Sequence, residues 1–141
     1  MKVKKIIPLL FVFMFLSLNI KAQSSTVEAN HDHLVIVWTS DDPYIAERMV
    51  LMYAHASKTA GWFDEVTLII WGPSAKMVAE NLKIQEKLKA MQQDGVEIRA
   101  CIVCANMYDV TEELKAMGFD VQGMGKPLTE YLKGGAKVLT F

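Results

Sequence analysis

Several patterns that would place this 141-residue chain in a narrow class are scarce or missing. It has no internal repeat, no heptad pattern and no low-complexity tract, which excludes a solenoid, a coiled coil and a biased linker. It has only two cysteines, while 52% of its residues are hydrophobic. A core can therefore form without covalent staples, and the two cysteines are free for another role.

A long membrane-spanning stretch is also missing. The apolar run of residues 6–18 is shorter than the about 20 residues that a transmembrane helix needs. Lys2, Lys4 and Lys5 precede the run and Ala22 follows it, which is typical of a secretory signal peptide. We expect a cleavable signal peptide (residues 1–22), a flexible leader (residues 23–33) and a periplasmic or secreted domain (residues 34–141). An uncleaved N-terminal anchor is the alternative, and no cysteine follows the run to carry a lipid.

A basic stripe is missing as well. Removing the lysines at positions 2, 4, 5 and 21 lowers the number of Lys and Arg residues from 15 to 11, against 16 Asp and Glu residues. A domain this acidic has neither the footprint of a nucleic-acid binder nor the polybasic patch of a protein that binds anionic membranes. We therefore expect no nucleic-acid partner, and no membrane contact after signal cleavage.

What the sequence does contain is a regular alternation of apolar runs and helical patterns. We expect strands at residues 34–38, 66–71, 96–103, 119–122 and 137–141. Between them we expect helices at residues 43–60, 72–94, 110–117 and 127–133, the third opened by a capping box from Asp109 to Glu112. This alternation predicts an α/β fold, a three-layer α/β/α sandwich with a five-stranded, mostly parallel sheet of flavodoxin-like architecture.

Cys101 and Cys104 carry the most specific chemical signal. They follow the third expected strand, at the carboxyl edge where such sheets collect their ligands. A thiol at this junction faces free backbone amides, which favour the reactive thiolate. A second cysteine three residues away can close a disulfide or resolve an adduct. We therefore take Cys101 and Cys104 as the candidate catalytic residues.

Other readings of the pair stay open. The two cysteines can be buried small hydrophobes, a structural disulfide or half of a metal site. A metal site needs further ligands, and the chain offers only His31 and His33 in the leader and His55 in a helix. We expect no metal and no cofactor. A thioredoxin-type oxidoreductase is the nearest rival, but its motif follows an early strand, and Ala100 stands where an aromatic residue would precede the first cysteine.

Three further residues are candidates for lining a pocket, each with a structural alternative. Asp42 can orient a ligand or cap a helix, Trp71 can line a pocket or pack in the core, and Tyr108 can donate a hydrogen bond to sulfur or simply pack. Several methionines at helical spacing fit the core or a subunit interface better than copper ligation. They are Met49, Met52, Met77, Met91 and Met117.

From about Leu34 to Phe141 the sequence resembles the DsrE/DsrF-like family of small sulfur-handling proteins. The resemblance depends on the order and spacing of four features rather than on any one of them. They are Asp42-Pro43, Gly61, the segment Cys101-Ile102-Val103-Cys104, and Leu128-Thr129-Glu130-Tyr131 before the closing Val138-Leu139-Thr140-Phe141.

The resemblance implies a homotrimer or homohexamer in which a cysteine after the third strand accepts sulfur as a persulfide and passes it on. Cys101 matches that cysteine, and Cys104 matches a second cysteine of some members. The implied partners are sulfur donor and acceptor proteins or small sulfur compounds. Tyr108-Asp109 stands where many relatives carry Arg-Gly, and the signal peptide departs from the cytoplasmic relays. A thiol–disulfide oxidoreductase and a non-enzymatic binding or assembly module remain the alternatives, so enzymatic activity is left open.

Overall fold

The computed structural model describes residues 32–141. The expected signal peptide and residues 23–31 of the expected leader lie outside the described residues. We expected the leader to reach residue 33, but strand β1 begins at His33, and the Asp64 amide donates a hydrogen bond to the Asp32 carbonyl at 3.0 Å. Asp32 and His33 therefore belong to the folded domain.

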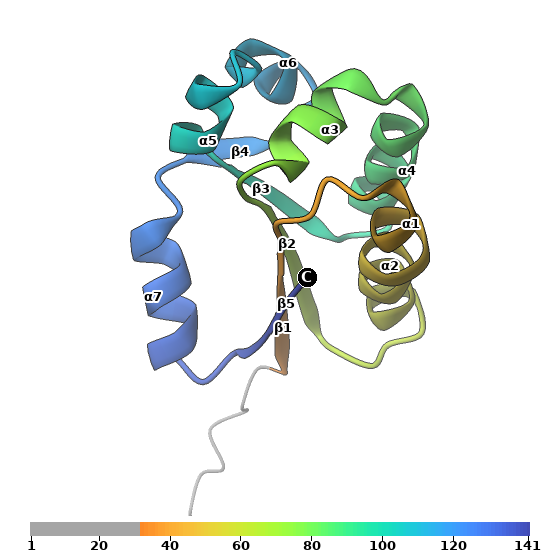
Figure 1. Ribbon diagram of the computed structural model, residues 1–141. Helices are drawn as coiled ribbons and strands as arrows, with labels where there is room; N and C mark the ends of the chain where they lie inside the picture. The colour runs from red at the N-terminus through yellow and green to blue at the C-terminus, as the bar shows by residue number, and fades with distance from the viewer. Residues whose placement is uncertain (1–31) are drawn as a thin grey trace, which may run out of the picture.

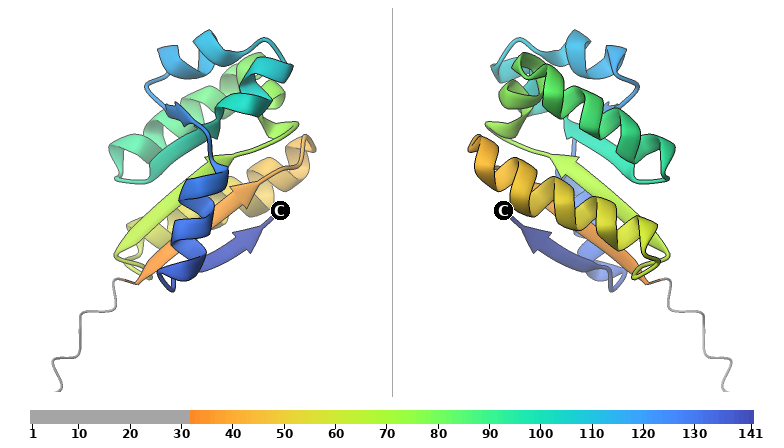
Figure 2. Two further views of the ribbon diagram at one scale, coloured as in Figure 1. Left: turned by 90° about the vertical axis from the view of Figure 1, so that its left-hand side faces the viewer. Right: turned by 90° about the vertical axis from the view of Figure 1, so that its right-hand side faces the viewer.

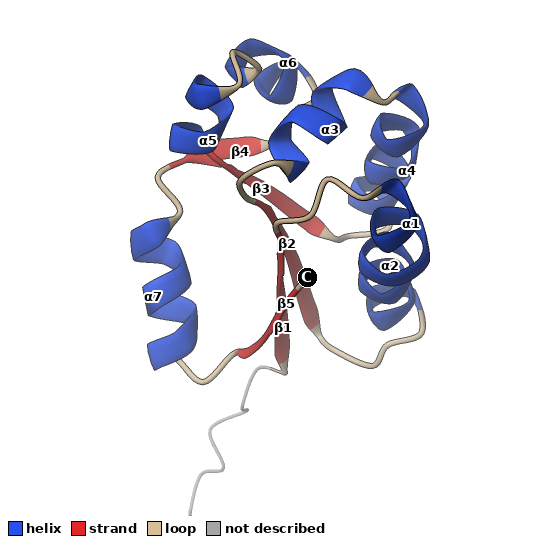
Figure 3. Ribbon diagram, in the orientation of Figure 1, coloured by secondary structure: helices blue, strands red, loops and turns tan. Residues whose placement is uncertain are grey.

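Strands and helices alternate along the described chain (Figures 1 and 3). The strands are β1 (His33–Trp38), β2 (Glu65–Ile70), β3 (Glu97–Cys101), β4 (Asp120–Gln122) and β5 (Lys137–Thr140). A three-part helix formed by α1 (Pro43–Ile45), the π-helical segment η1 (Ala46–Val50) and α2 (Leu51–Thr59) follows β1. The other helices are α3 (Ser74–Glu80), α4 (Leu82–Gln93), α5 (Ile102–Met107), α6 (Thr111–Ala116) and α7 (Gly125–Lys133).

All strand pairs are parallel, in the order β4-β3-β2-β1-β5. Helices α1 to α4 lie on one side of the sheet and α7 lies on the other (Figures 1 and 2). The expected α/β fold with a five-stranded parallel sheet between helices is confirmed. The strand order differs from the 2-1-3-4-5 order of flavodoxin. The similarity to flavodoxin is therefore limited to the layered arrangement of helices and sheet.

The core lies mainly between the sheet and helices α1 to α4. Leu34, Ile36 and Trp38 alternate along β1 and are fully buried, as are Leu68 and Ile70 on β2. Successive residues of a strand point to opposite faces, so these side chains, at every second position, share one face. The apolar residues that pack against them from the helices are Val50, Leu51, Ala54, Ile84, Leu88 and Met91.

Two methionines of the first helix are not part of this core. The buried positions there are Ala46, Val50, Leu51 and Ala54, whereas Met49 and Met52 are 51% and 59% exposed. The core alternative for Met49 and Met52 is therefore wrong. The subunit-interface alternative for these two residues stays a prediction.

The long helix expected over residues 72–94 is two helices. Asn81 has an extended conformation (φ −121°, ψ 100°), which ends α3, and its side-chain oxygen accepts a hydrogen bond from the Ile84 amide at 3.2 Å. Asparagine is a strong N-cap residue, so Asn81 starts α4 in a new direction. The loop before α3 and this break both come to lie beside the candidate site.

Candidate functional site

Both candidate cysteines lie where β3 passes into α5. Cys101 is the last residue of β3 and the N-cap of α5, while Cys104 lies in the first turn of that helix. Both are free thiols and both are buried, with 4% and 8% of their surface exposed. The thiols are in hydrogen-bond contact with each other. The structure therefore brings the two together, at the edge of the sheet where the sequence places them.

The loop between β2 and α3 supplies a backbone contact to this pair. The backbone of Gly72 hydrogen-bonds the sulfur of Cys104. Gly72 has a φ of +69°, a conformation that residues with a Cβ adopt at a cost. The loop is fixed by Ser74, whose hydroxyl donates to the Trp38 carbonyl at 2.7 Å and accepts from the Trp71 amide at 3.1 Å. Gly72 and Ser74 were not among the predicted site residues.

Burial raises the pKa of the Cys104 thiol above its ordinary value. The hydrogen bond from Gly72 acts in the opposite direction, and the contact with Cys101 adds to the increase. The expectation that helix amides hold a thiolate here is therefore wrong for Cys104, because its desolvation outweighs the hydrogen bond that it receives.

The end of α5 differs from the sequence-based expectation. Asp109 was expected to cap α6, but it has a left-handed φ of +56° and α6 has no side-chain cap. The Val110 amide donates to the Ala105 carbonyl at 2.9 Å and the Asp109 amide to the Asn106 carbonyl at 3.3 Å. This pair of bonds is a Schellman motif. Asp109 thus ends α5, and Glu112, the other half of the expected capping box, pairs with Lys115 instead at 2.9 Å.

A cleft of about 500 Å³ lies at the carboxyl edge of the sheet, and neither cysteine is among the residues that line it. It lies between the loop after β1, helix α3 and the end of α5. Tyr108, four residues after Cys104, lines it, as predicted for a pocket-lining residue. The other lining residues are Asp41, Pro43, Pro73, Lys76, Met77, Glu80 and Asn81.

Asp42 and Trp71 take their structural alternatives. The Asp42 carboxylate accepts hydrogen bonds from the amides of Tyr44 at 2.7 Å and Ile45 at 3.2 Å, which makes it the N-cap of α1. Trp71 is partly buried and packs against the core. Both residues shape the loops around the cleft.

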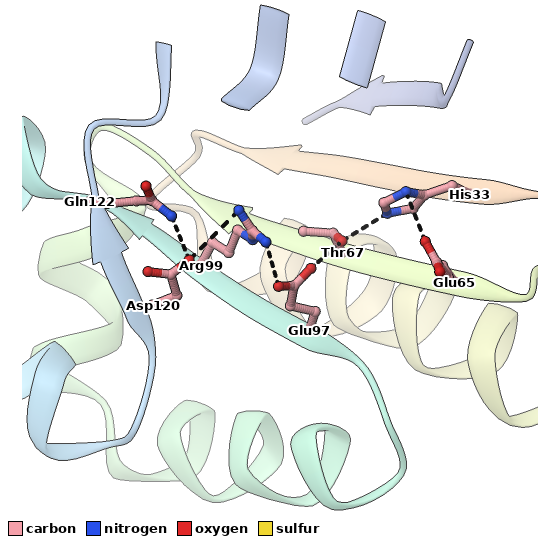
Figure 4. A network of polar contacts seen from close by, with 7 residues as sticks. All are labelled: His33, Glu65, Thr67, Glu97, Arg99, Asp120 and Gln122. Carbon is pink, nitrogen blue, oxygen red and sulfur yellow. Dashed lines mark hydrogen bonds and ion pairs between the residues drawn. The ribbon is translucent and has the colours of Figure 1, made fainter. Parts of the chain in front are cut away.

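A polar network that sequence reasoning missed lies on the sheet face that carries α7 (Figure 4). Arg99, two residues before Cys101, donates to Glu97 at 2.6 Å and lies 3.6 Å from Asp120. Thr67 is hydrogen-bonded to Glu97 at 3.0 Å and to His33 at 2.8 Å. Sequence analysis placed Thr67, Glu97, Arg99 and Asp120 in strands and His33 in the leader, because no local pattern shows which strands become neighbours.

The charges of this network stabilise one another. Burial opposes the ionisation of Glu97, but the hydrogen bonds from Arg99 and Thr67 outweigh it and lower the Glu97 pKa. The hydrogen bond to Glu97 raises the pKa of Arg99 in turn. Tyr131 of α7 contacts the network: its ring lies 5.8 Å from the Arg99 guanidinium and 5.0 Å from the His33 ring. The network therefore joins β3 to α7.

The two histidines of the described chain are separate from the cysteines. His33 pairs with Glu65 at 3.3 Å, and His55 lies between Asp94 at 2.6 Å and Lys87 at 2.7 Å. No group of three or more His, Cys, Asp or Glu side chains within residues 32–141 is placed to hold a metal ion. In the same residues, none of the helices is long and apolar enough to span a membrane.

Comparison with known proteins gives the chain a family. No curated protein matches it. A solved structure of a conserved protein of unknown function from Bacteroides thetaiotaomicron matches with a TM-score of 0.75 and 40% sequence identity, over 78% of this chain and 95% of that one. The model of the DsrE/DsrF-like family matches residues 32–141, all of the part that the structure describes. This chain therefore belongs to the DsrE/DsrF-like family.

Proposed function

We propose that this protein is a sulfur carrier that holds a persulfide on Cys101, with Cys104 as a resolving or assisting thiol. Membership of the DsrE/DsrF-like family suggests a function related to sulfur relay. The observation that carries the finer proposal is the pair of free thiols in mutual contact at the β3–α5 junction. Cys101 ends the third strand, where the family resemblance implies a sulfur-accepting cysteine.

The proposed step needs no redox partner. The Cys101 thiolate attacks the outer sulfur of a donor hydropersulfide, R–S–SH. A bond forms between Cys101 Sγ and that sulfur, the S–S bond of the donor breaks, and the donor leaves as a thiol that carries the proton. In the return step an acceptor nucleophile takes the outer sulfur and Cys101 regains its thiol.

Cys104 can act on the same intermediate, because the two thiols touch. Its attack on the inner sulfur of the Cys101 persulfide would release hydrosulfide and leave a Cys101–Cys104 disulfide. Resetting that disulfide takes an external thiol reductant. This branch is what a thiol–disulfide oxidoreductase would use as its main reaction, so the contact also favours that second candidate.

Loading experiments on cysteine variants separate the two functions. We expect the chain to gain one sulfur atom after incubation with a hydropersulfide donor, the Cys104→Ser variant to gain it as well, and the Cys101→Ser variant to lose most of the gain. An oxidoreductase instead reduces insulin disulfides only with both cysteines present. Full insulin reduction together with no sulfur gain would overturn the carrier proposal.

We also propose that the protein is exported. The support is the run of residues 6–18, the lysines at positions 2, 4 and 5 before it, and Ala22 after it. Expression with its own N-terminus in a bacterium, followed by N-terminal sequencing, should give a periplasmic chain that begins at Gln23. A full-length chain in the cytoplasm would contradict this proposal.

A further inference from the structure

The cleft at the carboxyl edge of the sheet carries groups that the proposed chemistry does not use. Two of its charged residues have opposite charges: Lys76 is cationic, whereas Asp41 is anionic. Lys76 makes an ion pair with Glu80 that is 3.9 Å long, and the side chains of both are more than half exposed. A loose, exposed ion pair contributes little to folding stability. The charges of Lys76 and Glu80 therefore remain available to a ligand.

Three of the lining residues are apolar. They are Pro43 at the start of α1, Pro73 in the loop after β2 and Met77 of α3. The polar groups of Asn81 and Tyr108 lie among the other lining residues. Apolar lining residues combined with a cation and carboxylates suit a small molecule that has a short apolar middle and carries both charges.

Neither cysteine lines the cleft, but two of its lining residues are close to Cys104 along the chain or through its contacts. Pro73 directly follows Gly72, whose backbone hydrogen-bonds the Cys104 sulfur. Tyr108 donates its backbone N–H to the Cys104 carbonyl at 3.2 Å, so it is one helical turn from that cysteine. A ligand in the cleft therefore lies against the two segments that enclose Cys104.

The burial of the thiols limits the size of the donor. Cys101 is 4% exposed and Cys104 is 8% exposed. A persulfide on another folded protein must bring its own backbone and neighbouring side chains to the reacting atom. A small hydropersulfide carries no such bulk, and so fits an almost covered thiol better.

We propose that this cleft binds a zwitterionic low-molecular-weight thiol or hydropersulfide of the amino-acid type, with its carboxylate at Lys76 and its ammonium at Asp41. This inference deepens the proposed sulfur-carrier function and depends on it for its meaning. It names the class of the donor: a free amino-acid persulfide rather than a protein cysteine.

Binding can be measured without any sulfur transfer. The probe is S-methylcysteine, titrated calorimetrically into the full chain carrying Cys101→Ser and Cys104→Ser. Two control probes each lack one charge: 3-(methylthio)propanoate lacks the ammonium and 2-(methylthio)ethylamine lacks the carboxylate. We expect the zwitterion to bind about two- to fivefold more tightly than either control, since an exposed ion pair contributes up to about 1 kcal/mol.

Charge variants test the placement. Lys76→Gln should abolish the preference for the probe with a carboxylate, and Asp41→Asn should abolish the preference for the probe with an ammonium. Lys115→Gln is the matched control, because Lys115 forms an exposed ion pair with Glu112 on α6. It should leave all three affinities unchanged.

The outcomes separate this inference from the sulfur-carrier function. Equal affinity for the three probes, or unchanged affinity in Lys76→Gln and Asp41→Asn, would overturn the ligand assignment even if Cys101 accepts sulfur from inorganic polysulfide. Tight, charge-dependent binding supports the assignment, also where no sulfur is gained, and in that case the carrier function alone fails.

Discussion

At the scale of single residues, the two thiols of the site are in contact but are not equivalent. Cys104 is in contact with the Gly72 backbone and with Cys101, and its burial raises its pKa. A buried thiol that holds its proton is a poor nucleophile at neutral pH. This favours a secondary role for Cys104.

The pH dependence of alkylation tests this difference. In a Cys101→Ser variant we expect Cys104 to react with iodoacetamide with a midpoint above the ordinary cysteine pKa of about 8.5. When the same variant is unfolded in guanidinium chloride, the midpoint of its reaction should return to the ordinary value. A folded midpoint at or below 8.5 would show that the amide of Gly72 outweighs burial, against this account.

The raised pKa also has a consequence for stability. Below the unfolded pKa of Cys104 both the folded and unfolded states hold the proton, and its titration has no effect. As the pH rises through the unfolded value, only the unfolded state ionises, so the folded state loses stability. The Cys104→Ala variant should lose less stability than the parent chain between neutral and alkaline pH.

Arg99 is the residue on which the missed polar network depends. It bonds to Glu97, faces Asp120 and lies against the ring of Tyr131. We expect Arg99→Met to lower the free energy of unfolding by about 1–2 kcal/mol in urea denaturation. Lys115→Met, which breaks an exposed pair with Glu112, should cost less than about 0.5 kcal/mol.

The pH dependence of the Arg99 effect follows from Glu97. Because the folded state lowers the Glu97 pKa, the stabilisation is present above the ordinary pKa of a glutamate and is lost as the pH falls through the folded value. The difference in the free energy of unfolding between the parent chain and Arg99→Met should therefore become smaller in acid. A difference that is constant down to low pH would assign the effect to packing rather than to charge.

At the scale of elements, the helix ends show which signals a sequence carries. Gly61, Gly95 and Gly118 have positive φ and follow helices α2, α4 and α6, where the sequence predicts helix ends. Asp109 plays the same role for α5 without being a glycine. A glycine makes such a helix end recognisable in the sequence, because glycine tolerates the left-handed conformation. An aspartate at the same place is read instead as the cap of the next helix.

Asp109 offers a direct test of that assignment. A non-glycine residue in this conformation costs about 1 kcal/mol, so Asp109→Gly should leave the stability unchanged or increase it by up to about 1 kcal/mol. If Asp109 capped α6, the same change would lose a capping bond and lower the stability. Urea denaturation of the two chains decides between these outcomes.

The candidate site was predictable in part for the same reason. The cysteine pair and Tyr108 are local in the sequence, and the rule that sites gather at carboxyl ends of parallel strands places them correctly. The Gly72 contact, the break at Asn81 and the cleft depend on how the loops after β1, β2 and β3 meet. That meeting is set by tertiary packing, which no window of the sequence contains.

At the scale of the whole molecule, the fold leaves three large side chains of its first helix exposed. Tyr44, Met49 and Met52 of the first helix are 68%, 51% and 59% exposed. Large apolar side chains exposed on a monomer are often covered in an assembly when they form one patch. This agrees with the homotrimer or homohexamer that the family resemblance implies, and which we propose for this chain.

Sedimentation equilibrium tests the assembly. We expect the mature chain to sediment as a trimer or hexamer, and the double variant Met49→Lys, Met52→Lys to have a smaller mass while keeping its circular dichroism spectrum. Gln93→Lys, a substitution at the far end of α4, is the matched control and should leave the mass unchanged. A parent chain that is monomeric at micromolar concentration would contradict the proposed assembly.

The position of the added sulfur tests the central claim most directly. Trypsin releases one peptide, residues 100–115, that contains both cysteines, because it cleaves after Arg99 and Lys115. After loading with a hydropersulfide and alkylation, fragmentation of this peptide between residues 101 and 104 should assign the extra sulfur to Cys101. Extra sulfur on Cys104 alone, or none on either residue, would contradict the account.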